Sequence, residues 1–172
     1  MSAKDVLKLM KSKNIEFVDL RFTDPRGKLQ HLTMDTTIVD EGMLNDGVFF
    51  DGSSIAGWKA INESDMILKP DLSRKVIDPY TSHNTLILFC DILDAVKRDP
   101  YERDPRGIAK KAEAYLKKTG IGDTAYFGPE PEFFVFDDVR FKNEMNETSF
   151  SIDSSEGPVS YTHLTLPTSG VV

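Results

Sequence analysis

Two glutamates, Glu130 and Glu132, stand two positions apart at the start of an apolar run, residues 133–136. Side chains alternate between the two faces of a β-strand, so in a strand these carboxylates would point the same way, about 6–7 Å apart. Pro129 and Pro131 fix the backbone angle φ and remove two amide donors, which stiffens the strand entrance. Paired carboxylate oxygens suit a hard divalent cation such as Mg²⁺. An exposed acidic strand end accounts for the same residues, so both interpretations stand at this point.

A second group of chemically capable side chains lies in residues 49–58, FFDGSSIAGW. Asp51 is followed by two serine hydroxyls, and Gly52 and Gly57 permit backbone conformations that bulky residues avoid. Binding groups collect on loops that a rigid scaffold holds, so this composition predicts a binding loop. A surface turn capped by Asp and Ser side chains is the alternative.

Length and charge narrow the class of protein. The 172 residues suggest one domain, or a small domain and part of another. The chain is 40% hydrophobic and 28% charged, which is ordinary for a globular protein. Its net charge is −7 and its Lys and Arg residues are scattered, which argues against nucleic acid as a partner.

The single cysteine, Cys90, lies in an apolar strand pattern, residues 85–91, which predicts an inert buried thiol. One cysteine forms no internal disulfide, in keeping with a reducing cytosol. The polar N-terminus shows no apolar leader and no apolar run approaches about 18 residues. We therefore expect no signal peptide, no membrane association and a cytoplasmic location.

The elements that must position the loop form a small α+β sheet domain, residues 1–99. Ser2 predicts the cap of a first helix, and residues 38–46 predict one or two further helical turns. Apolar runs predict strands at residues 16–22, 29–34, 66–68, 75–77 and 86–91. His31 lies in one of these strands with no His or Cys nearby, so we expect a structural role for it.

A polar, proline-rich stretch, residues 97–105, predicts a link to a second region, residues 104–158. There Asp104 predicts a helix cap, with Pro105 at the first helical position and Gly120 closing the helix. Further strands are predicted at residues 125–136, which carry the two glutamates, and at residues 139–141 and 148–152.

Several motifs, in one order along the chain, together resemble the glutamine synthetases. FDGSSI at 50–55, followed by GW at 57–58 and NESDM at 62–66, resembles the active-site loop of that family. FGPEPEFF at 127–134 resembles its metal-binding strand. FVDLRFTD at 17–24 and DPR at 104–106 also fit. The resemblance runs from about residue 3 to Pro158 and is greatest to the bacterial type I enzymes, whereas residues 159–172 resemble nothing in the family and are expected to be a non-family tail.

The resemblance implies a fold and an activity. The fold is a β-grasp-like N-terminal domain followed by the truncated start of the catalytic domain. The activity is ATP-dependent ligation of ammonia to L-glutamate through γ-glutamyl phosphate. Glu130 and Glu132 would each hold one of two Mg²⁺ or Mn²⁺ ions. Asp51 and Ser54 would lie on a loop that reaches into the adjacent subunit's active site, where Asp51 helps to bind ammonium and takes its proton.

The resemblance also implies binding partners, and it implies that this chain lacks part of the active site. Type I members assemble as dodecamers, two stacked rings of six, and bind L-glutamate, ammonium and ATP. The family's other metal ligands and its residues for ATP and glutamate lie beyond Pro158, so we expect this chain alone to be inactive. Two alternatives remain: a related ATP-dependent carboxylate–amine ligase such as a γ-glutamylpolyamine synthetase, and a non-catalytic assembly fragment.

Overall fold

The computed structural model describes residues 2–58, 64–131 and 133–155. Contacts between residues divide the chain into two units, Met1–Thr124 and Ala125–Val172. The helix predicted after Asp104 groups, by its contacts, with the first unit. Each unit is described by itself below.

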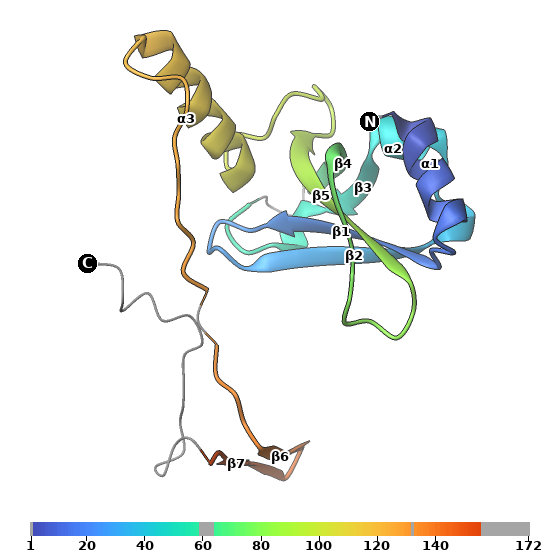
Figure 1. The fold of residues 1–172 in the computed structure, drawn as a ribbon, viewed down its shortest axis with the longest axis vertical. Helices are drawn as coiled ribbons and strands as arrows, with labels where there is room; N and C mark the ends of the chain where they lie inside the picture. Colours follow the sequence, from blue (N-terminus) through green and yellow to red (C-terminus); the bar gives the residue numbers. More distant parts are fainter. Residues whose placement is uncertain (1, 59–63, 132, 156–172) are drawn as a thin grey trace. The chain divides into compact units, whose positions relative to one another are not determined.

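The first unit is built on a five-stranded mixed sheet with the strand order β2-β1-β5-β4-β3 (Figure 1). The strands are β1 (Phe17–Thr23), β2 (Leu29–Asp35), β3 (Val48–Asp51), β4 (Asp65–Ile77) and β5 (Thr85–Asp94). The central pair β1 and β5 is parallel, and all other neighbours are antiparallel. This mixed sheet with short helices confirms the predicted α+β class.

The helices begin where the sequence places caps. They are α1 (Ala3–Ser12), α2 (Glu41–Asp46) and α3 (Pro105–Thr119), with two 3-10 turns, η1 (Thr36–Ile38) and η2 (Gly52–Ser54). Ser2 and Asp5 form a reciprocal capping box, in which the Asp5 amide donates to Ser2 Oγ at 3.3 Å and the Ser2 amide donates to Asp5 Oδ2 at 2.9 Å. None of the described helices is long and apolar enough to cross a membrane.

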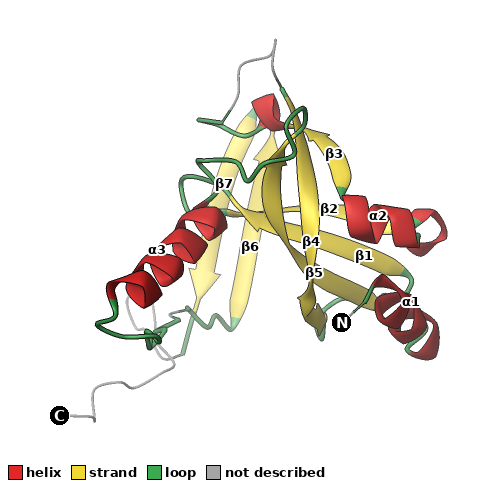
Figure 2. Cartoon of the chain, turned by 90° about the horizontal axis from the view of Figure 1, so that it is seen from above, coloured by secondary structure: helices red, strands yellow, loops and turns green. Residues whose placement is uncertain are grey.

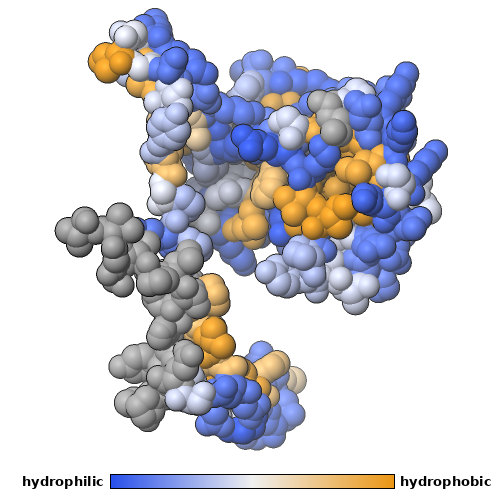
Figure 3. Space-filling view, in the orientation of Figure 1, coloured by the Kyte–Doolittle hydropathy of each residue, from blue (hydrophilic) through white to orange (hydrophobic). Residues whose placement is uncertain are grey.

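The hydrophobic core lies between the sheet and the first two helices, which sit beside each other next to the strands (Figure 2). Val6 of α1 and Leu44 of α2 are fully buried with Leu20, Leu68 and Leu88 of the sheet. Figure 3 shows an apolar area on the face of the first unit turned to the viewer. Removing the buried side chains of the core from water, rather than this exposed area, is the main force that holds the unit together.

Strand β4 is one long strand where the sequence predicted two short ones. Its pairing with β5 shifts register between Pro70 and Lys75. Proline offers no amide to the ladder, which is why the pattern looked broken there, and an irregularity of this kind lets the strand continue past it.

Gly47 fixes the junction between α2 and β3. Its φ is +87°, and a Cβ atom there would lie 2.5 Å from the Leu68 carbonyl oxygen and 2.6 Å from Ile67 Cγ2. Only glycine combines this backbone angle with such close packing against β4. Strand β3 begins at the next residue and ends at Asp51.

Among its described residues the second unit contains one hairpin, β6 (Asp138–Glu144) paired with β7 (Glu147–Asp153), as predicted. The strand predicted over residues 125–136 is absent: those described have no regular secondary structure, and Glu132 lies outside the described residues. A strand exists through its neighbours, and none of the described strands pairs with this stretch. The two prolines further reduce its capacity for ladder bonds.

Candidate functional site

Asp51 stands where strand β3 passes into the turn η2. Its Oδ1 accepts hydrogen bonds from the Ser53 amide at 2.8 Å and from the Ser53 hydroxyl at 2.6 Å. The side chain thereby caps η2 and holds the chain as it leaves the sheet. Because Asp51 is the last residue of a paired strand, a rigid element carries it, while its carboxylate remains exposed.

The electrostatics of this loop favour the ionised form of Asp51. Hydrogen bonds from the Ser53 hydroxyl and amide are the main cause of its lowered pKa, and the hydroxyls of Ser64 and Ser54 add to them. Desolvation opposes the shift by more than either the Ser64 or the Ser54 hydroxyl adds to it, and the pKa remains lowered. The structure thus brings the two predicted catalytic residues, Asp51 and Ser54, together. At neutral pH the group is an exposed carboxylate that can attract a cation.

A cluster of aromatic side chains packs around Trp58, at the end of the loop. The Trp58 ring stacks on Phe22 with centroids 5.6 Å apart, and it meets the Phe50 and Tyr101 rings edge-on at 6.0 Å and 5.9 Å. At the loop's start, the Gly52 amide donates to the Ser64 carbonyl at 2.7 Å. These contacts position residues 51–58 on the sheet rather than leaving them as a free surface turn.

Two residues that sequence analysis missed contact the same loop. The Tyr101 hydroxyl donates to the Trp58 carbonyl at 2.8 Å, and Arg103 Nη1 donates to the Gly57 carbonyl at 2.9 Å. Both lie in the stretch interpreted only as a link. The one signal for them in the sequence is an aromatic residue within an otherwise polar segment.

The predicted metal pair is described only in part. Glu130 is exposed in the second unit, and Glu132 lies outside the described residues. No group of three or more His, Cys, Asp or Glu residues in the described ranges is arranged to hold a metal ion. Carboxylate oxygens have the right chemistry for a hard cation, but two of them make an incomplete ligand set. By the chemistry of their donor atoms, the two glutamates would serve a divalent ion only together with further ligands.

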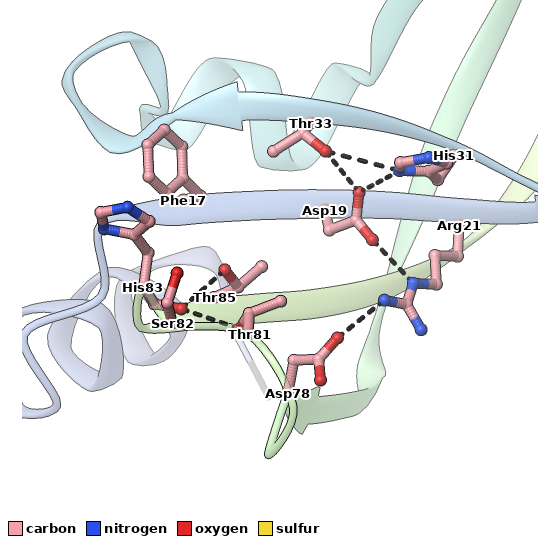
Figure 4. A pocket seen from close by; sticks show the side chains of 10 residues that line it. All are labelled: Phe17, Asp19, Arg21, His31, Thr33, Asp78, Thr81, Ser82, His83 and Thr85. Carbon is pink, nitrogen blue, oxygen red and sulfur yellow. Dashed lines mark hydrogen bonds and ion pairs between the residues drawn. The ribbon is translucent and has the colours of Figure 1, made fainter. Parts of the chain in front are cut away.

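A polar network occupies one face of the sheet, around a hollow of about 400 Å³ (Figure 4). Buried Asp19 accepts hydrogen bonds from Arg21 Nε at 2.7 Å and from the Thr33 hydroxyl at 2.8 Å, and it lies 2.8 Å from His31 Nδ1. Arg21 also pairs with Asp78 at 2.9 Å. Burial acts to raise the pKa of Asp19, but hydrogen bonds from Arg21, His31 and Thr33 together lower it.

This polar network is satisfied from within. His31, for which we predicted a structural role, is one of its members, and each carboxylate in it has a cationic or hydroxyl partner. Such paired groups stabilise one arrangement of the sheet face and leave little charge to recruit a ligand. Cys90, on the neighbouring strand β5, is buried, and burial raises the pKa of its thiol, as expected for an inert core residue.

Charged groups attach helix α3 to the sheet. Asp104 is buried, caps α3 by accepting from the Arg106 amide at 3.1 Å, and accepts from the Ile92 amide of β5 at 3.2 Å. Arg106 pairs with Asp91 at 2.8 Å and also with Asp71. Burial raises the pKa of Asp104. The helix has no buried residues of its own, so these contacts at its N-terminus determine how it joins the sheet.

Two family models match the chain. The glutamine synthetase β-grasp domain matches residues 14–95, and the glutamine synthetase catalytic domain matches residues 102–168. The two matches divide within the link, and the second includes part of residues 159–172, which lie outside the described residues. Fold and loop thus define a β-grasp sheet domain that leads into a catalytic domain of the same family.

Curated relatives agree with both matches. The glutamine synthetases of Rhizobium meliloti and of Escherichia coli are 62% and 54% identical to the chain over 157 residues, which is 91% of this chain and 34% of each relative. The cryo-EM structure of Plasmodium falciparum glutamine synthetase has a TM-score of 0.69 at 25% identity, over 91% of this chain and 30% of that one. The chain belongs to the glutamine synthetase family, and it spans about a third of the length of the curated relatives it matches.

Another solved structure, apo GmaS, shares the fold. Its TM-score is 0.60 at 21% identity, over 67% of this chain and 27% of that one.

Proposed function

We propose that this chain is the N-terminal part of a glutamate–ammonia ligase, which joins ammonia to L-glutamate with ATP through γ-glutamyl phosphate. The observation that carries the proposal is the Asp51 loop. An ionised carboxylate stands exposed at the end of a rigid strand, in a domain matched by the family's β-grasp model. Relatives that are 54–62% identical over this stretch are glutamine synthetases.

Asp51 acts on ammonia in this proposal. Ammonium has no lone pair and becomes a nucleophile only when it loses a proton. The Asp51 carboxylate attracts ammonium by its charge and accepts that proton. Its lowered pKa makes it a good cation ligand and a weak base, so proton transfer depends on the positive field around the bound substrates. Ser54 keeps a hydroxyl at the same carboxylate.

Glu130 and Glu132 would hold Mg²⁺ or Mn²⁺, the cations that carboxylate oxygens suit. When bound, such ions offset the charge on phosphoryl oxygens during transfer from ATP. The remaining metal ligands and the residues that contact ATP and glutamate belong to the part of the family's length that this chain does not span. Alone, the chain is therefore expected to make no glutamine.

We extend the proposal to the assembly. The active enzyme is a homo-oligomer, a dodecamer, in which the exposed Asp51 loop of one subunit completes the active site of its neighbour. The protein works in the cytoplasm, without nucleic acid or membrane partners. The exposure of the Asp51 carboxylate supports the shared site, because nothing in the described part of its own domain covers it.

A chimera tests the activity. Residues 1–158 of this chain are joined to the remaining two thirds of the Rhizobium meliloti relative, and ATP-dependent glutamine formation is measured. We expect an active chimera in which Asp51→Asn lowers kcat/KM at least about 100-fold, the scale of a lost general base. Asp40→Asn, which keeps a helix cap far from the loop, is the control and should retain activity. Full turnover by Asp51→Asn would refute the role of Asp51.

Metal binding separates an enzyme part from an assembly-only fragment. In the chimera, Mn²⁺ affinity measured by calorimetry should fall when Glu130→Ala and Glu132→Ala are combined, because the ions then lose two charged ligands. The pair Glu144→Ala and Glu147→Ala, on the β6–β7 hairpin, is the matched control. Unchanged Mn²⁺ affinity in the first double variant would contradict the metal role.

A further inference from the structure

We infer that Tyr101 and Arg103, in the link between the two family domains, are positioning residues for the Asp51 loop. They hold the far end of that loop by its backbone carbonyls. The inference rests on the proposed function of the loop, and it assigns a second task to a stretch that otherwise only joins two domains.

The polar contacts converge on two successive carbonyls. The Tyr101 hydroxyl donates to the Trp58 carbonyl at 2.8 Å inside the protein, and Arg103 Nη1 donates to the Gly57 carbonyl at 2.9 Å at the surface. The Tyr101 ring also meets the Trp58 ring edge-on, with centroids 5.9 Å apart. A buried hydrogen bond is costly to leave unmade, so the first contact specifies where Trp58 lies.

Tyr101 is itself fixed to the centre of the sheet. Its amide donates to the Ile92 carbonyl of β5 at 2.8 Å, and its carbonyl accepts from the Asp104 amide at 3.1 Å. Pro100, the preceding residue, forms an isolated bridge with Leu93. The backbone of Tyr101 is thus bonded to β5, while its side chain is bonded to Trp58 of the loop. One residue therefore links the sheet to the loop.

The loop needs such a tie at this end. Gly57 has a φ of +88° with open space around it, so its own packing does little to restrain the chain. The Trp58 indole N–H is buried with no hydrogen-bond partner among the described residues, and within that part of the chain the indole is held by packing against other rings. The hydrogen bonds from Tyr101 and Arg103 to the two carbonyls therefore restrain the orientation of the loop backbone, which the aromatic packing does not fix. Loosening them would let residues 52–58 sample other positions, and with them the Ser53 and Ser54 hydroxyls that hold the Asp51 carboxylate.

The chain carries its own probe for this inference. Trp58 is its single tryptophan, so intrinsic fluorescence reports on the end of the loop that Tyr101 holds. Tyr101→Phe keeps the ring and removes the hydroxyl. In the whole 172-residue chain we expect the acrylamide quenching constant of Trp58 to rise at least about twofold, with a red-shifted emission, because one buried hydrogen bond is lost. Arg103→Ala should give a smaller rise, since its contact is exposed.

Tyr115→Phe is the matched control, because Tyr115 is exposed on α3. It should leave Trp58 quenching unchanged. Circular dichroism and the urea midpoint establish that each variant is folded; should Tyr101→Phe fail to fold, Arg103→Ala decides alone. Wild-type quenching in the folded Tyr101→Phe variant, or in Arg103→Ala where that variant decides, overturns the inference.

The measurement needs no catalysis, so its outcome is separate from that of the proposed function. A chimera that makes no glutamine would refute the proposed function and leave the tie between link and loop standing. In an active chimera, Tyr101→Phe should raise the KM for ammonium several-fold and leave the KM for glutamate unchanged. A KM for ammonium that stays the same, or that rises in step with the KM for glutamate, contradicts a positioning role for Tyr101.

Discussion

The lowered pKa of Asp51 comes mainly from one neighbouring residue, Ser53. The Ser53 hydroxyl and amide both donate to Oδ1, and they are the main reason that the pKa of Asp51 is lowered. A carboxyl that accepts such bonds releases its proton more readily, because the bonds favour the charged form.

Removing the Ser53 hydroxyl should therefore raise the pKa of Asp51. In Ser53→Ala we expect the ¹³C-detected NMR titration of the Asp51 carboxyl to move to higher pH than in the wild type. Ser73→Ala is a close control, since Ser73 donates to Asp71 in the same pattern. An Asp51 titration that is the same in Ser53→Ala and in the wild type would contradict this account.

Asp19 should make stability depend on pH. Its folded-state pKa is lowered, so its contribution is present above the ordinary carboxyl pKa and is lost as the pH falls below about 4. We expect Asp19→Asn to lower the free energy of unfolding by about 1–3 kcal/mol at pH 7, because Arg21 loses a partner. Urea unfolding at pH 7 and pH 3 checks this. A deficit of the same size at both values would show that the charge is not responsible.

The sequence predicted Asp51 and Ser54 as site residues and gave no prediction for Tyr101 and Arg103, and the reason lies in how each is encoded. The loop is a contiguous motif, and its chemistry is visible in adjacent letters. Tyr101 contacts a backbone carbonyl 43 residues earlier. Every residue has such a carbonyl, so the residue types do not show which one is contacted. Contacts of this kind appear only when the chain is folded.

Among the elements, helix ends were predictable because they are local. Asp104 and Pro105 predicted the start of α3, and the helix ends at Gly120, which has a left-handed conformation. Strands depend on distant partners, which is why the strand expected over residues 125–136 was wrong for the described residues. The apolar pattern indicates only a tendency to form a strand, and pairing with a neighbouring strand decides whether the strand forms.

The cap at Asp104 should matter more than an ordinary one. Asp104→Ala removes a cap and also orphans the buried Ile92 amide, so we expect a loss of about 2–4 kcal/mol in the free energy of unfolding. Asp40→Ala, at the exposed cap of α2, should cost about 1 kcal/mol. Asp104→Asn should cost less than Asp104→Ala, because it keeps an acceptor oxygen and removes the charge, whose burial raises the pKa of Asp104. Equal losses for Asp104→Ala and Asp40→Ala in urea unfolding would contradict the link to β5.

At the scale of the whole molecule, the described part of the second unit has little interior of its own. Phe127 is 90% exposed, and Phe141 and Phe150 on the hairpin are exposed as well. Apolar surface of this extent is normally covered by other protein. It fits a chain that spans a third of its relatives' length.

Supplying that missing length should turn residues 125–136 into a strand. In the chimera with the Rhizobium meliloti relative, we expect amide hydrogen exchange over this stretch to slow at least about tenfold relative to the 172-residue chain, because ladder bonds protect amides. Residues of α1, already formed in the first unit, are the internal reference. Exchange that is equally fast in both proteins would show that the stretch is no strand in either.

The missing side chain of Gly47 has an effect four residues away. Even a methyl group there would press against the backbone of β4, and the short strand β3 could yield only by sliding or lifting. Because β3 ends at Asp51, that movement would reach the carboxylate directly. Gly47→Ala would thus displace the Asp51 carboxylate although Gly47 lies outside the Asp51 loop.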